Sequence, residues 1–347
     1  MTGDSETSGS RCNLARRGLE AIARRAIPLL PERYRTPTAD YALQKALKDV
    51  TSRVFLGLDR IGLHLLPKHF YSPVADYAWL RANRRYWDQP ASMTGVRWDL
   101  NEQMEWLRSI CLPYIGEVAG LASIDAITRD RYGPGFGPID AQVLHCAMRS
   151  LAPARVVEIG SGVSTVVMLG ASGANVRDGR RLSRITTVDP NPTAELSGRS
   201  DVRVIRDFAQ RVPMDVFEQL RDGDLLFIDS SHAVKVGSEV VRLFLDVIPK
   251  LPAGVIIHVH DVSLPYLYPR SELSDFFGWQ ETTLLLALMT GNPGLRPLAS
   301  LSALHYDRTE ELRKLLPDYR PQENDAGMRT GNWAHSHFPD SMWIRVT

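Results

Sequence analysis

A chain of 347 residues is long enough for one large domain with an additional segment, and a content of 44% hydrophobic residues suits a buried core. Its 41 lysines and arginines nearly balance 40 aspartates and glutamates, which argues against a nucleic-acid partner or an acidic substrate. The longest apolar run, LLLALM at residues 284–289, is too short to cross a membrane, so stable membrane insertion is not expected.

The cysteines and the N-terminus indicate the compartment. Cys12, Cys111 and Cys146 are odd in number and far apart, and they match neither a metal-binding spacing nor a disulfide framework. Residues 1–30 contain no apolar segment of the kind found in secretory signals. These features favour a reducing compartment, and we expect a cytoplasmic protein.

The first part of the chain is predicted to be mostly helical. Residues 1–11 are small and polar, which predicts disorder, and residues 12–30 have the pattern of a basic amphipathic helix with a solvated face. The following residues are rich in large aromatic side chains, more than a linker needs. We therefore predict an N-terminal region over residues 1–130 that shapes an acceptor pocket, forms a lid or makes a subunit contact in a homo-oligomer. A second domain is predicted over residues 131–347.

In this second domain, short apolar runs alternate with segments of helical pattern. Such alternation is typical of an α/β fold with a parallel sheet and right-handed crossovers. Two later runs, around residues 299–304 and at 341–346, are predicted to pair as a terminal antiparallel hairpin. The strand candidates of the parallel part are residues 155–159, 184–189, 202–205, 225–229 and 255–260.

A glycine-rich turn, in the sequence VVEIGSGVST, follows the first strand candidate. Gly160 and Gly162 permit a tight turn and the close approach of a ligand. Ser164 and Thr165 fall at the start of the next helix, where free backbone amides attract anions. A dinucleotide fingerprint would carry glycine in place of Thr165, and the acid Glu158 would repel a pyrophosphate, which disfavours a nicotinamide-dependent enzyme. An acid at this place suits a ligand that carries an ammonium group.

Acidic residues end several of the later strand candidates. Asp189 ends the second, at a place where a carboxylate typically binds ribose hydroxyls. Asp229 ends the fourth and Asp261 follows the fifth, while His232 lies shortly after Asp229. Ligands of open α/β sheets bind beyond the carboxyl ends of the strands, so we expect one site there. Two neighbouring carboxylates repel each other unless a proton or a cation lies between them, and Mg²⁺ prefers such oxygen ligands.

The fifth strand candidate ends in the sequence HVHD. Because side chains alternate along a strand, His258 and His260 are expected on one face and Val259 on the other. His258 is predicted to be a hydrogen-bonded structural histidine. His260, next to Asp261, is a candidate ligand for the metal, although imidazole is a poor ligand for Mg²⁺.

The motif of Glu158, Gly160 and Gly162, followed by Asp189, resembles the cofactor site of class I S-adenosylmethionine (SAM)-dependent methyltransferases. This resemblance implies a Rossmann-like sheet of seven strands with helices on both faces. It places Glu158 near the methionine ammonium, Ser164 near the carboxylate and Asp189 on the ribose. The cofactor-binding residues that it implies are Glu158, Gly160, Ser161, Gly162, Ser164, Thr165, Asp189, Asp207 and Asp229.

The acidic strand ends resemble those of metal-dependent O-methyltransferases of the catechol and macrocin types. In these enzymes two acids hold Mg²⁺, the metal binds the substrate hydroxyl, and a base three residues after the first acid removes the proton. The resemblance implies that Asp229 and Asp261 hold the metal, with His260 as a further candidate, and that His232 is the base. The chain departs from the catechol pattern at Val262, where those enzymes carry an amide ligand.

Longer stretches, among them GFGPIDAQVL, IDSSHAVKVGSEV and IHVHDVSLPYLYP, resemble the bacterial Methyltransf_24 group. The resemblance predicts O-methylation of a hydroxyl on a small-molecule acceptor, such as a sugar or a secondary metabolite of natural product biosynthesis. Two alternatives stay open: N- or carboxyl-methylation without a metal, and a SAM-binding module without catalytic activity. The charge balance and the lack of an Asn-Pro-Pro-type tetrapeptide disfavour methylation of nucleic acid.

Overall fold

The computed structural model describes residues 49–50, 52–64, 66, 72–118, 136–268, 273, 278–321 and 338–347. The chain divides into two compact units, residues 1–76 and residues 77–347. Residues 52–59 of the first unit are helical. The predictions for residues 1–11 and 12–30 fall outside the described residues. The boundary between the units lies earlier in the chain than the domain boundary that we predicted at residue 130.

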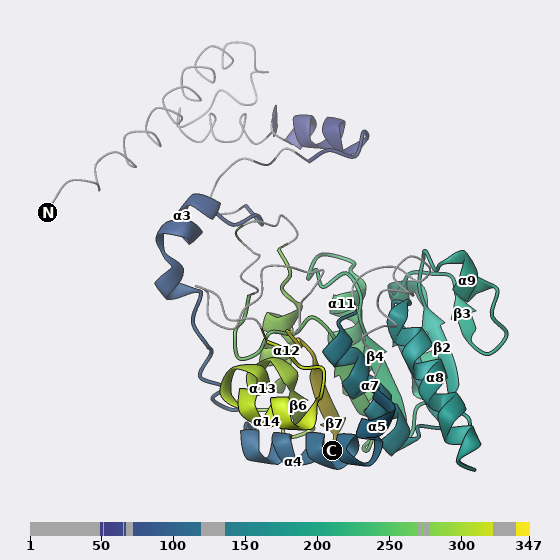
Figure 1. Cartoon of the computed structure of the whole chain (residues 1–347). Helices are drawn as coiled ribbons and strands as arrows, with labels where there is room; N and C mark the ends of the chain where they lie inside the picture. Colours follow the sequence, from purple (N-terminus) through teal and green to yellow (C-terminus); the bar gives the residue numbers. More distant parts are fainter. Residues whose placement is uncertain are drawn as a thin grey trace, which may run out of the picture. The chain divides into compact units, whose positions relative to one another are not determined.

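A seven-stranded sheet forms the centre of the second unit, with the strand order β3-β2-β1-β4-β5-β7-β6 (Figure 1). Strands β1 to β5 pair with one another in parallel, and β7 runs antiparallel to both β5 and β6. The predicted seven-stranded α/β fold is therefore confirmed. The strands are β1 (Arg155–Ile159), β2 (Arg184–Val188), β3 (Arg203–Ile205), β4 (Leu225–Ile228), β5 (Ile256–Val259), β6 (Leu295–Ser300) and β7 (Met342–Val346).

The last two strands differ from the prediction in one respect. Their antiparallel pairing is as predicted, but β6 begins at Leu295 and the chain turns into a helix directly after Ser300. The side chain of Ser300 accepts a hydrogen bond from the backbone N–H of Ala303, which caps helix α13 (Leu301–Asp307). In the sheet, β6 is the edge strand, and β7 lies between β5 and β6.

Helices cover both faces of this sheet, because its strands are apolar on both sides (Figure 1). Val156 and Phe227 belong to one core cluster, whereas their neighbours Val157 and Ile228 belong to the other. The longer helices around the sheet are α4 (Leu100–Cys111), α7 (Pro138–Leu151), α8 (Val163–Arg177), α12 (Glu281–Met289), α13 and α14 (Thr309–Leu315). The shorter ones are α3 (Tyr77–Ala82), η3 (Arg84–Tyr86), η4 (Leu112–Tyr114), α5 (Ile115–Val118), α9 (Ala194–Ser197), η5 (Ala209–Arg211), α10 (Asp215–Glu218), α11 (Glu239–Arg242), η6 (Leu243–Val247) and η7 (Ile248–Lys250).

Helix α4, from the predicted N-terminal region, belongs to the core of the second unit. Asp99 caps it by accepting hydrogen bonds from the backbone N–H groups of Asn101 and Glu102. Met104 and Leu107 follow at a helical spacing and are buried, and the helix packs against α7 and β6. No helix among the described residues is long and apolar enough to span a membrane.

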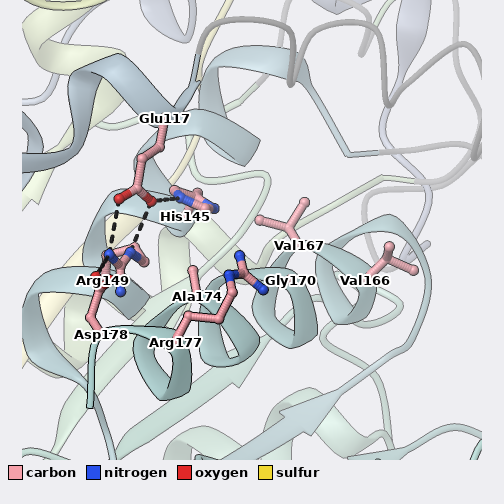
Figure 2. A pocket seen from close by; sticks show the side chains of 9 residues that line it. All are labelled: Glu117, His145, Arg149, Val166, Val167, Gly170, Ala174, Arg177 and Asp178. Carbon is pink, nitrogen blue, oxygen red and sulfur yellow. Dashed lines mark hydrogen bonds and ion pairs between the residues drawn. The ribbon is translucent and has the colours of Figure 1, made fainter. Parts of the chain in front are cut away.

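A cavity of about 440 Å³ is lined by residues of α5, α7 and α8, together with Asp178 after α8 (Figure 2). Arg149 lies beside it with only 2% of its surface exposed, and it binds the carboxylates of Glu117 and Asp178. The same guanidinium donates to the side chain of Asn175. This network ties α5 and α7 to α8, and the cavity contains none of the predicted site residues.

Candidate functional site

The turn after β1 requires glycine for a reason within the protein itself. Gly160 has a φ of 86°, in the left-handed region, and its N–H donates to the carbonyl oxygen of Val188 in β2. A Cβ at this position would lie 1.9 Å from the carbonyl oxygen of Asp229, directly after β4. The group that approaches Gly160 closely is thus the end of the neighbouring strand β4, where the sequence had suggested a ligand. Gly162, with a φ of 163°, has an extended backbone that other residues also adopt.

Glu158 is fully buried below this turn and is bound by the first turn of α8. The hydroxyl of Ser164 donates to Glu158 Oε1 and that of Thr165 to Oε2, each at 2.7 Å. The backbone N–H of Gly162 in turn donates to Thr165 Oγ1 at 3.1 Å. Burial raises the pKa of Glu158 to about 8, against the opposing effect of these hydrogen bonds. The acid and the hydroxyl of Ser164 therefore contact each other directly.

Two further acids follow the neighbouring strands. Asp189, after β2, accepts hydrogen bonds from the hydroxyl of Ser161 at 2.5 Å and from the backbone N–H of Asn191 at 2.7 Å. Asp207, after β3, accepts from Arg211 Nε at 2.5 Å, and this hydrogen bond lowers the pKa of the carboxyl. Because β1, β2 and β3 are adjacent and parallel, Ser161, Asp189 and Asp207 follow the same edge of the sheet.

Asp229, His232 and Asp261 come together at the ends of the adjacent strands β4 and β5. His232 Nε2 lies 3.1 Å from Asp261 Oδ2 and 3.6 Å from Asp229 Oδ1. One potential ligand atom from each residue lies within 4.8 Å of the other two, a spacing that a single cation could bridge. The Asp229 side chain is 26% exposed, against 10% for Asp261 and 6% for His232. A ligand therefore has its most direct access from the side of Asp229.

The surroundings shift the pKa values of the two carboxylates in this cluster in opposite directions. Burial opposes the ionisation of Asp261, but the charges of His260 and His232 outweigh it and lower its pKa to about 2. Burial raises the pKa of Asp229, and the charge of Asp261 adds to this effect. Burial also opposes protonation of His232, but hydrogen bonds to Asp261 and Glu281 raise its pKa well above its usual range. The cluster thus combines an Asp261 whose ionised form is favoured with a His232 whose protonated form is favoured.

A second group of acids, which the sequence analysis missed, supports the end of β5. Asp140 of α7 is buried and accepts a hydrogen bond from the hydroxyl of Ser341 at 2.5 Å. Asp340, just before β7, accepts with its backbone carbonyl from the N–H of Val262 at 2.5 Å. One potential ligand atom each from Asp140, His260 and Asp340 lie within 4.8 Å of one another. For Asp340 the sequence does contain a signal. This acid stands just before the predicted antiparallel strand at 341–346, and such a strand begins at the edge of the sheet where the parallel strands end.

His258 differs from its prediction as a hydrogen-bonded histidine. Its ring stacks on that of Phe227, with centroids 4.3 Å apart and 6° between the planes. Neither ring nitrogen has a hydrogen-bond partner among the residues that the structure describes. Burial lowers its pKa well below the usual range, so the ring is neutral and behaves as an aromatic core residue. His258 and His260 do share one face of β5, with centroids 5.9 Å apart.

Comparison with known proteins identifies the domain that carries these residues. Residues 157–262 match the family model Methyltransf_24, described as a methyltransferase domain. The chain contains a methyltransferase domain. The match begins within β1 and ends just after Asp261, so it contains the glycine-rich turn and the cluster of Asp229, His232 and Asp261. The predicted methyltransferase class is therefore confirmed for the domain that carries these residues.

The solved structures that resemble this methyltransferase are distant. One is the methyltransferase PaMTH1 of Podospora anserina bound to S-adenosylhomocysteine (SAH), with 16% identity, a TM-score of 0.38 and coverage of 66% of this chain and 88% of that one. Another is an O-methyltransferase of Bacillus cereus in complex with SAH, with 14% identity, a TM-score of 0.37 and coverage of 66% and 90%. A comparison with curated proteins found no match.

Proposed function

We propose that this methyltransferase transfers the methyl group of SAM to a hydroxyl of a small molecule. The observation that carries the proposal is a histidine beside two carboxylates: His232 Nε2 lies 3.1 Å from Asp261 and 3.6 Å from Asp229. A hydroxyl must lose its proton as it accepts a methyl group, and a positioned histidine can take that proton.

The proposed cofactor site extends from the turn after β1 to the ends of β2 and β3. SAM supplies a methyl group that is already activated for displacement. Asp189 is suited to the ribose hydroxyls, because acids at this place commonly accept hydrogen bonds from them. Glu158 offers a negative charge to the ammonium group of the methionine part once its hydrogen bonds with Ser164 and Thr165 rearrange. Ser161, Asp207 and Asp229, which follow the same edge of the sheet, complete the proposed site.

Asp229 and Asp261 also fit a divalent cation. Two neighbouring carboxylates repel each other, and a hard metal such as Mg²⁺ bound between them removes this repulsion. A metal held there would make a bound hydroxyl more acidic. Its positive charge would also weaken the attraction between Asp261 and the imidazolium of His232. The ring would then lose the proton on Nε2 more readily, and Nε2 could accept the proton of the substrate. His260 Nε2, 3.8 Å from Asp261 Oδ1, is better suited to orienting that carboxylate than to binding Mg²⁺ itself.

The segment before α4 supports the proposal that N-terminal residues shape the acceptor pocket. The backbone N–H of Ala91 donates to the carbonyl of Pro265 at 2.8 Å, in the loop that follows Asp261. The ring of Trp87 meets that of Tyr268 in the same loop, with centroids 6.4 Å apart. This segment thus joins the loop after β5, on the side where the acceptor would bind. A subunit contact by residues 1–130 stays a prediction.

Two substitutions test the proposed chemistry. We expect His232→Ala and Asp261→Asn each to lower turnover by about a hundredfold, the scale of losing a positioned base. The affinity for SAM, expected in the micromolar range or about −8 kcal/mol, should stay nearly unchanged in calorimetry. Turnover is measured as release of SAH with a panel of phenolic and sugar acceptors.

Chelation tests the role of the metal independently. Removing divalent cations with a chelator should mimic Asp261→Asn, and added Mg²⁺ should restore the wild type but not the variant. Full activity after chelation would favour metal-free N- or carboxyl-methylation instead. Near-normal turnover of His232→Ala would remove the base from the mechanism, and failure of SAM to bind would refute the cofactor site.

A further inference from the structure

We infer that Glu281 is the positioning residue of His232 and determines which ring nitrogen faces the acceptor. The inference rests on the proposed function, in which His232 is the base. Glu281 is the first residue of α12 and lies 49 positions after His232. It lies outside the segment that matches the methyltransferase family model.

The start of α12 holds His232 by its ring and by its backbone. Glu281 Oε2 lies 2.7 Å from His232 Nδ1, in a hydrogen bond between two buried side chains. The backbone N–H groups of Gln280 and Glu281 both donate to the carbonyl oxygen of His232, at 3.1 and 3.2 Å. The ring of Trp279 contacts the imidazole at an angle of 47°, with centroids 4.5 Å apart. Three consecutive residues thus fix one histidine.

His232 needs such support because its own backbone conformation is unfavourable. Its φ of 56° lies in the left-handed region, which residues with a Cβ rarely adopt. Strained residues of this kind persist only where their surroundings hold them, and they cluster at functional sites. The contacts from Trp279, Gln280 and Glu281 supply that hold.

The hydrogen bond to Glu281 assigns different roles to the two ring nitrogens. A carboxylate only accepts hydrogen bonds, so Nδ1 carries a proton and donates a hydrogen bond to Glu281. Nε2 is then the nitrogen that faces Asp229 and Asp261. It can accept a proton in the neutral form of the ring, which a metal held by the two carboxylates would favour. During methyl transfer the acceptor O–H bond breaks and an Nε2–H bond forms, while an O–C bond replaces the S–C bond of SAM. Glu281 takes no proton in this step and keeps its hydrogen bond.

A structural role alone does not account for Glu281. Acids are common in the first turn of a helix, where they interact with the helix dipole, but they do so at the surface. Glu281 is 1% exposed, and burying a carboxylate is costly unless its oxygens are paired. Its Oε1 has no hydrogen-bond partner within the described part of the chain. The hydrogen bond between Oε2 and His232 is therefore the interaction that accounts for the buried position of the side chain.

The experiment combines NMR of the histidine ring with steady-state kinetics on the full chain. The nine histidines are labelled with ¹⁵N, and the signals of His232 are assigned by their loss in His232→Ala. In the wild type we expect Nδ1 to be protonated and hydrogen-bonded. In Glu281→Ala we expect the Nδ1 signal to move toward that of a free imidazole, with a mixture of tautomers at a pH where the ring is neutral.

The kinetic arm separates positioning from folding. Glu281→Ala should lower kcat about 10- to 100-fold, by analogy with the partners that orient metal-bound histidines, with the KM and the affinity for SAM nearly unchanged. Glu281→Gln has the same shape and can still accept from Nδ1, so it should recover part of both the kcat and the ring signal. The control is Glu239→Gln, because Glu239 accepts from the backbone N–H of Ser231 in the same loop at 3.0 Å without touching His232. It should leave kcat and the ring signals unchanged.

Unchanged ring signals in both Glu281 variants would overturn the inference, and so would an unchanged kcat while His232→Ala is inactive. If the ring signals shift as expected but His232→Ala retains full turnover, the error lies in the proposed base and not in the positioning. If Glu281→Ala does not fold, Glu281→Gln decides the question by the same two measurements.

Discussion

Replacing Gly160 by alanine should destabilise the methyltransferase domain, because the new methyl group meets a neighbouring backbone. Its Cβ would lie 1.9 Å from the carbonyl oxygen and 3.1 Å from the carbonyl carbon of Asp229. A backbone atom cannot rotate away as a long side chain can, so the ends of β1 and β4 must separate. In addition, Gly160 has a φ of 86°, a conformation that alanine rarely adopts.

The two effects give the expected magnitude. A residue with a Cβ in the left-handed region costs about 1–2 kcal/mol. Forcing a methyl group into a packed region costs about 1–3 kcal/mol more. The smaller conformational freedom of alanine in the unfolded chain offsets about 0.4–1 kcal/mol of this. We therefore expect the free energy of unfolding to fall by about 2–4 kcal/mol.

Urea denaturation followed by circular dichroism measures this change, with Gly170→Ala as the control. Gly170 lies in α8 of the same βα unit, and a Cβ there would meet nothing within 4 Å. Alanine favours the helix over glycine by about 0.5–1 kcal/mol, so the control should be slightly stabilised. Equal stability of the two variants would refute the steric argument. Turnover of Gly160→Ala should also fall, because Asp229 has to move.

Two further predictions concern buried charges. The folded protein holds the pKa of Glu158 at about 8, above the ordinary value of 4.5, so between these pH values it retains a proton that the unfolded chain has lost. The free energy of unfolding without cofactor should therefore fall as the pH rises from about 4.5 to 8, and Glu158→Gln should remove this part of the dependence; identical pH profiles would contradict it. Arg149→Ala should cost about 2–3 kcal/mol in urea denaturation, less than a fully buried pair, because Glu117 and Asp178 are 37% and 56% exposed and can be hydrated again. A cost below about 0.5 kcal/mol would show that the network around Arg149 contributes little.

Local sequence patterns predicted the parallel strands almost residue by residue. The runs at 155–159 and 225–229 became β1 (Arg155–Ile159) and β4 (Leu225–Ile228), because short apolar segments between turn residues have few alternatives to a buried strand. The alternation with helices determined that the strands are parallel. Asp229 and Asp261 could then be predicted to lie near each other, because parallel strands end at the same edge of a sheet.

Tertiary structure alone decided which distant segments complete that edge. The insertion of β7 between β5 and β6 brings Asp340 to His260, and the start of α12 brings Glu281 to His232. The packing of β4 against β5 likewise left His258 stacked on Phe227 in the core. A sequence pattern reports which face of an element is buried, but not which distant element covers it. The partners of these side chains were therefore determined by how the elements pack and not by their own neighbours in the chain.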